Sequence, residues 1–127
     1  MSFKEYLRID DPLIPRLATG FGAGIGRKGS ICGALAGAVM ALGMRLGRTD
    51  ASDQDRKERA YQKCYEFCSQ FEKEFGSQAC RDLTGVHLDN PEERKTWLEA
   101  GGTKKCASIV EKTAEMLCKW METLPTR

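Results

Sequence analysis

The sequence predicts an all-α protein of five to six helices packed around one core. No run of strand length alternates between apolar and polar residues. Alanine, glutamate, lysine and leucine dominate the composition, whereas valine and isoleucine are sparse. Apolar residues also recur at helical spacing in the longest segments. Since the 127 residues contain no internal repeat and no low-complexity linker, residues 1–127 are expected to form a single domain.

The N-terminal part is expected to hold a lead-in, a short helix and a loop. Residues 1–11 are polar and mixed, which is typical of a flexible lead-in. Asp11 can cap a short helix that has Pro12 at its first position and ends at Gly20. Five glycines among residues 20–29 then predict a loop.

The next two helices have clear start and stop signals. The first covers residues 30–46, with Ser30 as its N-cap. The second begins near Ser52 or Asp53 and ends at Gly76. One apolar seam follows the second helix at spacings of three and four residues, formed by Tyr61, Cys64, Cys68, Phe71 and Phe75.

Three further helices are expected in the C-terminal half. Ser77 begins a brief helix that ends at Gly85, Asn90 begins the next, and Thr103 caps the last. The helix after Asn90 carries Trp97 and Leu98. The apolar positions of the last helix include Val110, Ala114, Leu117, Met121 and Leu124.

Composition excludes several classes of protein. A net charge of +2 without a basic and aromatic surface argues against nucleic-acid binding. The longest apolar stretch, residues 30–43, is shorter than the roughly 20 residues that span a bilayer, so no membrane insertion is expected. The N-terminus does not resemble a secretory signal, which favours a cytoplasmic protein. Six cysteines in that reducing compartment indicate metal binding, redox chemistry or core packing.

Three cysteines, Cys32, Cys80 and Cys106, follow predicted helix caps by two or three residues. In the first turn of a helix, unpaired amides and the helix dipole stabilise an anion. Cationic side chains also lie beside each of them in the sequence, namely Arg27, Lys28, Arg81, Lys104 and Lys105. Both effects lower the pKa of a thiol, so these three are predicted to be reactive or metal-ligating thiolates. The alternative is that they are small buried core residues.

The other candidate ligands favour structural roles. Cys64 and Cys68 lie four residues apart and could face one metal, but they share the apolar seam and are assigned to the core first. Cys118 lies among the apolar residues of the last helix. His87 is predicted in a loop, solvated, with a fourth-ligand role as the alternative.

The glycine-rich loop contains a literal G-x-G-x-x-G at Gly24, Gly26 and Gly29. Because no strand precedes it, a dinucleotide site is not expected. A glycine-rich loop before a helix can instead present amides, together with Arg27, to a thiolate or small anion. The alternative is a tight turn that lets two backbone segments approach closely.

The helix after this loop presents small residues on one face. Gly33 and Gly37 are spaced one turn apart, together with Ala34, Ala38 and Ala41. Such a face predicts close contact with another helix, either within the chain or across a homodimer.

Three segments together resemble the C_GCAxxG_C_C family. They are residues 17–43, which contain the core Cys32–Gly37, and residues 75–83 and 105–110, which carry the two downstream cysteines. The resemblance implies a redox-active protein, and the family's frequency in anaerobic bacteria and archaea suits an oxygen-sensitive thiol or cluster. The family pattern has an additional cysteine upstream of the glycine-rich loop, whereas this sequence has none before Cys32.

These observations leave four hypotheses. The leading one is a redox or iron–sulfur protein in which Cys32, Cys80 and Cys106 form a thiolate cluster with a further ligand and an unidentified redox partner. The second is a thiol–disulfide oxidoreductase. The third is a module that binds zinc or another soft metal, and the fourth is a helical interaction module with core cysteines. The residues do not decide whether the protein is an enzyme.

Overall fold

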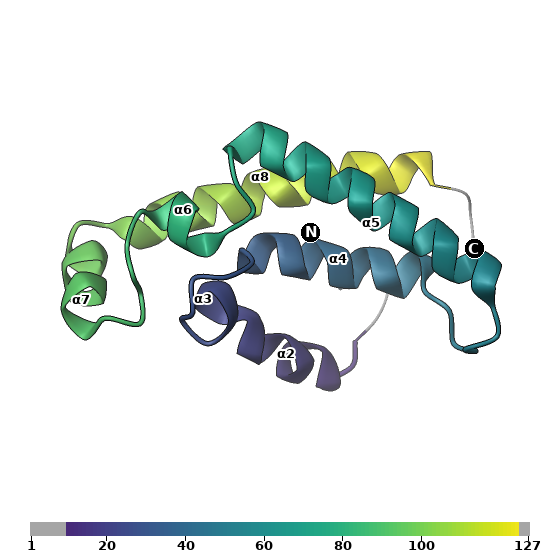
Figure 1. Cartoon of the computed structure of the whole chain (residues 1–127), viewed down its shortest axis with the longest axis horizontal. Helices are drawn as coiled ribbons and strands as arrows, with labels where there is room; N and C mark the ends of the chain where they lie inside the picture. The colour runs from purple at the N-terminus through teal and green to yellow at the C-terminus, as the bar shows by residue number, and fades with distance from the viewer. Residues whose placement is uncertain (1–9, 125–127) are drawn as a thin grey trace.

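The computed structural model describes residues 10–124. All secondary-structure elements assigned in that range are helices, which confirms the all-α prediction. Three long helices, α4 (Gly33–Leu46), α5 (Gln54–Phe75) and α8 (Gly102–Thr123), pack together, as Figure 1 shows. The shorter elements are α2 (Leu13–Ala18), η1 (Thr19–Phe21), α3 (Gly22–Ile25), α6 (Cys80–Thr84) and α7 (Pro91–Glu99). Most of the predicted lead-in, residues 1–9, lies outside the described residues. None of the described helices is long and apolar enough to cross a membrane.

Local signals set several helix ends. The Asp53 side chain accepts a hydrogen bond from the amide of Arg56 at the start of α5, and Gly76 ends that helix with a φ of +89°. The Asn90 side chain accepts from two amides in the first turn of α7. These predicted boundaries are confirmed. At the start of the chain α2 begins at Leu13, although Asp11 still accepts from its amide.

The core lies between α4, α5 and α8. Its largest fully buried side chains are Phe67, Phe71, Leu35, Leu42, Leu117 and Met121. The ring of Phe67 meets Trp120 edge-on, with centroids 5.4 Å apart, and the indole N–H of Trp120 donates to Gln70 over 2.7 Å. Both contacts of Trp120 therefore join α5 to α8.

Two residues of the predicted seams point away from the core. Tyr61 is 63% exposed, whereas Phe67, which the predicted seam of α5 omits, is fully buried. In α8, Val110 is 54% exposed and its neighbour Ile109 is buried. One residue along a helix turns the side chain by about 100°, so a small error in the assigned face exchanges such neighbours.

The small-residue face of α4 makes contacts within the chain. Ala38 and Ala41 are buried, and α4 packs against both α5 and α8. Ala38 and Ala41 of this face therefore pack inside the fold, whereas Gly33 and Gly37 are exposed, and the homodimer stays a prediction.

The glycine-rich segment is a left-handed turn. From Ala23 to Arg27 the φ angles of five successive residues lie between +53° and +70°, and three of these residues are not glycine. Left-handed backbone costs an L-residue roughly 1–2 kcal/mol. The predicted loop is thus a strained but defined structure, and other contacts must hold it.

Hydrogen bonds within the segment and to α6 hold this turn. The amides of Gly26, Gly29 and Ser30 donate to carbonyl oxygens six residues earlier, over 2.9–3.3 Å. The guanidinium of Arg81 donates to the carbonyl oxygen of Lys28 over 3.0 Å. Because α6 contributes contacts from far along the chain, the strained turn depends on tertiary packing.

The same substitution should therefore have opposite effects at two alanines. Ala23→Gly is expected to stabilise the protein by about 1 kcal/mol, because it relieves the strain at a φ of +53°. Ala107→Gly, at an exposed position within α8, is expected to destabilise it by about 1 kcal/mol. Urea unfolding followed by circular dichroism measures both. Equal destabilisation by the two variants would contradict the left-handed turn.

Candidate functional site

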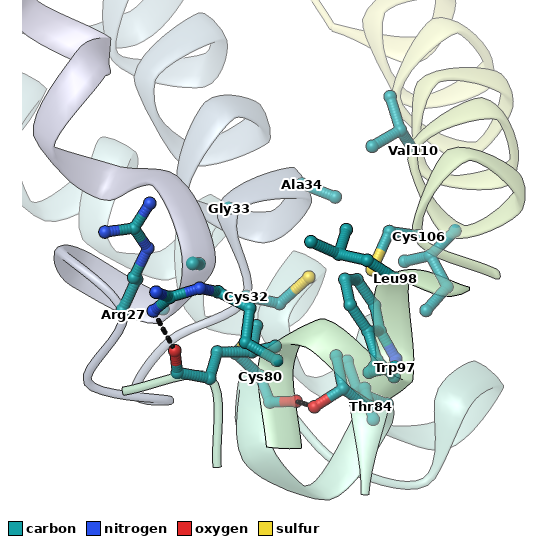
Figure 2. Close-up of a pocket in the computed structure, with 16 residues that line it drawn as sticks. Arg27, Cys32, Gly33, Ala34, Cys80, Thr84, Trp97, Leu98, Cys106 and Val110 are labelled. Atoms are coloured by element: carbon teal, nitrogen blue, oxygen red, sulfur yellow. Dashed lines mark hydrogen bonds between the residues drawn. The ribbon is translucent and has the colours of Figure 1, made fainter. Parts of the chain in front are cut away.

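A cavity of about 410 Å³ lies where α3, α4, α6, α7 and α8 converge. Cys32, Cys80 and Cys106 all line it, as Figure 2 shows. The remaining lining is mainly apolar and is formed by Ala23, Gly24, Arg27, Gly33, Ala34, Leu83, Thr84, Leu88, Arg94, Trp97, Leu98, Ile109 and Val110. The fold therefore brings together three cysteines that are separated by up to 74 positions in the sequence, from 32 to 106.

An antiparallel backbone bridge joins the segments that carry Cys32 and Cys80. Ile31 pairs with Ala79, the amide of Cys32 donates to Gln78 over 2.8 Å, and the amide of Cys80 donates to Ser30 over 2.6 Å. Extended backbone at residues 30–32 delays the next helix. The prediction that Ser30 caps α4 is therefore wrong: Cys32 is the N-cap, and its side chain makes no capping hydrogen bond.

The starts of α6 and α8 also differ from prediction. Ser77 accepts a hydrogen bond from the amide of Ala79 in a turn before the helix, so α6 begins only at Cys80. At α8 the N-cap is Gly101, with a φ of +80°, instead of Thr103. Cys106 is consequently the fifth residue of α8 and not in its first turn.

The electrostatic setting of two thiols is opposite to that predicted. Burial raises the pKa of the Cys80 thiol, thiolates at Cys32 and Cys106 raise it further, and Arg81 lowers it. Burial also raises the pKa of Cys106, a thiolate at Cys32 adds to this, and Lys105 lowers it. The cationic neighbours act in the expected direction, but burial is the larger effect.

The hydrogen bonds of α6 explain why its N-terminus does not stabilise a Cys80 thiolate. The amides of Cys80 and Arg81 donate to the carbonyl oxygens of Ser30 and Gly29. These donors are therefore already satisfied by the glycine-rich segment. A helix of five residues also has little dipole to offer.

Of the three glycines of the predicted anion site, Gly24 lines the cavity and Gly26 and Gly29 do not. Gly24 lines the cavity, and a Cβ there would lie 2.7 Å from the Cβ of Cys80. The amides of Gly26 and Gly29 are paired with backbone oxygens, and neither residue lines the cavity. Arg27 lines the cavity with an exposed side chain. Within residues 10–124 its guanidinium has no hydrogen bond or ion pair.

The other candidate ligands lie outside this cavity. Cys64 and Cys68 are partly buried against the core, and burial raises the pKa of both thiols. Cys118 is half-buried on α8, and His87 borders a shallow surface hollow beside α7. None of them lines the cavity with the three cysteines.

The described side chains do not form a ready set of ligands for a thiolate-bound metal or cluster. In the described part of the chain, no group of three or more histidine, cysteine, aspartate or glutamate side chains is placed to hold a metal ion. Zinc and iron–sulfur clusters take most of their ligands from such groups. The three thiols share a cavity without forming that set.

Sequence reasoning did not identify the wall opposite Cys32. Trp97 packs directly over Gly102, where an added Cβ would overlap the indole ring. Arg94 is held by a hydrogen bond of 2.8 Å from its Nη1 to the carbonyl oxygen of Leu88. The paired glycines 101–102 were the available signal, since close packing of a ring on backbone requires a glycine.

Comparison with family models finds a match over nearly the whole chain. Residues 1–120 match the family model described as "Putative redox-active protein (C_GCAxxG_C_C)". Neither the curated proteins nor the solved structures give a significant match. Because the family model covers nearly the whole chain, this protein belongs to the C_GCAxxG_C_C family.

Proposed function

We propose that Cys32, Cys80 and Cys106 form a dithiol–disulfide redox site that exchanges with an external disulfide. The observation that carries this proposal is the convergence of the three thiols on one cavity. In Figure 2 the sulfur atoms of Cys32 and Cys106 border the same space between α4 and α8. Their electrostatic coupling is consistent with this proximity.

Cys32 is the thiol that attacks first. Cys32 and Cys106 are both partly exposed, whereas Cys80 is buried, and the pKa of the Cys106 thiol is raised. The Cys32 thiolate attacks one sulfur of the external disulfide, so that a mixed disulfide forms and one thiolate leaves. Cys80 or Cys106 then loses its proton to solvent and attacks the Cys32 sulfur. This step forms the protein disulfide and releases the second thiolate, so the protein loses two electrons and the external disulfide gains them.

The raised pKa values of Cys80 and Cys106 suit a thiol that attacks only after the mixed disulfide has formed at Cys32. A thiol whose pKa is raised by partial burial and by a neighbouring thiolate stays protonated near neutral pH, so it does not compete for the external disulfide. Once Cys32 is bonded in a mixed disulfide its negative charge is gone. The pKa of both neighbours then falls, which favours the second attack at that stage.

Intact-mass spectrometry tests the redox site. Metal-free reduced protein is treated with a limiting amount of 2,2′-dithiodipyridine, and its mass is measured before and after dithiothreitol. We expect a loss of two hydrogen atoms that dithiothreitol reverses. The loss should persist in Cys118→Ser, whose thiol lies outside the cavity, and should occur about a hundredfold more slowly, or slower still, in Cys32→Ser.

A second measurement separates this couple from thiolate-bound metal. Protein purified anaerobically is analysed for iron, zinc and acid-labile sulfide. We expect less than stoichiometric metal, because the described residues offer no ready set of ligands. A stoichiometric cluster or zinc ion that is lost in Cys106→Ser would favour the metal-binding hypothesis over the disulfide couple.

A further inference from the structure

The charged side chains that line the cavity are of one sign. Of the 16 residues that line it, two are arginines, Arg27 and Arg94, and none is an aspartate or glutamate. Two further cations, Arg81 and Lys105, act electrostatically on the cysteines. With an apolar wall around it, such a site attracts negative charge more strongly than an open surface does.

The polar side chains that line the cavity differ in how many of their hydrogen-bonding groups are already used within the protein. The hydroxyl of Thr84 donates to the carbonyl oxygen of Cys80 over 2.9 Å. Arg94 already uses Nη1 on Leu88. Arg27, by contrast, has no hydrogen bond or ion pair within residues 10–124. Its guanidinium is the lining group best able to pair with a carboxylate or phosphate.

The apolar part of the cavity is large and partly uncovered. Leu83, Leu88 and Ile109 are buried in its wall, while Leu98 and Val110 remain 49% and 54% exposed. The indole of Trp97 is fixed against Gly102 and supplies a rigid aromatic surface. A volume of about 410 Å³ lies in the ordinary range for small-molecule sites.

We infer that the external disulfide or thiol is a small, mainly apolar molecule that carries one anionic group paired with Arg27. Among such molecules the site favours aromatic ones. This inference rests on the proposed redox site, since the same cavity presents the three thiols. Trp97 and the aliphatic wall receive the apolar part, Arg27 holds the anionic group at the rim, and the sulfur of the ligand lies at Cys32.

Four disulfides of known chemistry test the inference. They are 5,5′-dithiobis(2-nitrobenzoate), 2,2′-dithiodipyridine, 3,3′-dithiodipropionate and cystamine, which are respectively aromatic and anionic, aromatic and neutral, aliphatic and anionic, and aliphatic and cationic. The rate at Cys32 is measured by acid quenching and mass spectrometry of the Cys32 peptide. Each rate is divided by that of a neutral free thiol, N-acetylcysteine amide, to remove the intrinsic reactivity of the reagent.

We expect the largest normalised rate for the aromatic anion, by about tenfold over the aliphatic anion, and the smallest for cystamine. Arg27→Gln should slow both anionic reagents by about tenfold while it changes 2,2′-dithiodipyridine by less than about a factor of two. Arg27→Lys should keep most of the anionic rate. Lys28→Gln is the matched control, because Lys28 is an exposed cation next in sequence that does not line the cavity.

The outcomes separate the two proposals. If Cys32 reacts in all proteins but Arg27→Gln and Lys28→Gln have equal effects, the inferred ligand class is wrong and the redox site stands. If cystamine gives the fastest normalised rate, the ligand class is likewise wrong. If Cys32 fails to react faster than Cys118 with any of the four, the redox site itself is wrong.

Discussion

Replacing Gly24 with alanine is expected to destabilise the protein by about 3 kcal/mol, whereas Gly26→Ala should cost only about 1 kcal/mol. Both glycines have positive φ angles, +70° and +55°, so both substitutions add strain of the same kind. They differ in space. A Cβ at Gly24 would lie within 2.7 Å of Cys80 and the backbone of residues 29–30, whereas a Cβ at Gly26 meets nothing within 4 Å.

The difference between these two variants isolates the contact between the left-handed turn and α6. Urea unfolding of both proteins gives the two free energies, and labelling of Cys80 by iodoacetamide in the folded state reports whether the turn still covers that thiol. Gly24→Ala should label Cys80 faster than Gly26→Ala does. Equal unfolding free energies and equal labelling would show that the turn does not pack on Cys80.

Replacing Cys32 with serine is expected to slow the formation of the protein disulfide by about a hundredfold or more at neutral pH. The reason is that the two thiols that remain in the cavity have raised pKa values and Cys80 is buried, so neither offers an accessible thiolate. Stopped-flow mixing with 2,2′-dithiodipyridine measures the rate. Cys118→Ser should react like the wild-type protein, because that thiol is outside the cavity.

The reaction rate that remains in Cys32→Ser should increase with pH. A thiol below its pKa gains about tenfold in thiolate for each pH unit, and raised values extend this rise to higher pH. In Cys32→Ser the residual reaction should therefore keep rising above pH 9, beyond the ordinary range of a cysteine. Wild-type kinetics in the Cys32→Ser protein, or a residual rate that levels off below pH 8, would contradict Cys32 as the first attacking thiol.

Local sequence signals predicted what is decided locally. Asp53, Gly76 and Asn90 set helix ends through hydrogen bonds or backbone angles within a few residues, and these boundaries were predicted correctly. The absence of alternating patterns was equally sufficient for the all-α class. The three cavity cysteines could also be selected, because glycine and cysteine patterns mark them in the sequence.

Contacts between distant segments account for several features that could not be predicted. The bridge between Ile31 and Ala79 replaces helix with extended backbone before Cys32, and no residue near Ser30 indicates its partner 48 positions later, from 31 to 79. The same bridge takes up the amide of Cys80, which changes the expected effect on its pKa. Trp97 was placed on a helix by its sequence, but its position over Gly102 depends on the angle between α7 and α8.

The shared role of the three cavity thiols can be read directly from a peptide map of the oxidised protein. After oxidation by a limiting amount of 2,2′-dithiodipyridine, free thiols are blocked with N-ethylmaleimide, and the digest is sequenced by mass spectrometry. One disulfide should join Cys32 to Cys80 or Cys106, with Cys64, Cys68 and Cys118 recovered as blocked thiols. A disulfide formed among Cys64, Cys68 and Cys118, with Cys32 recovered free, would contradict a redox site in this cavity.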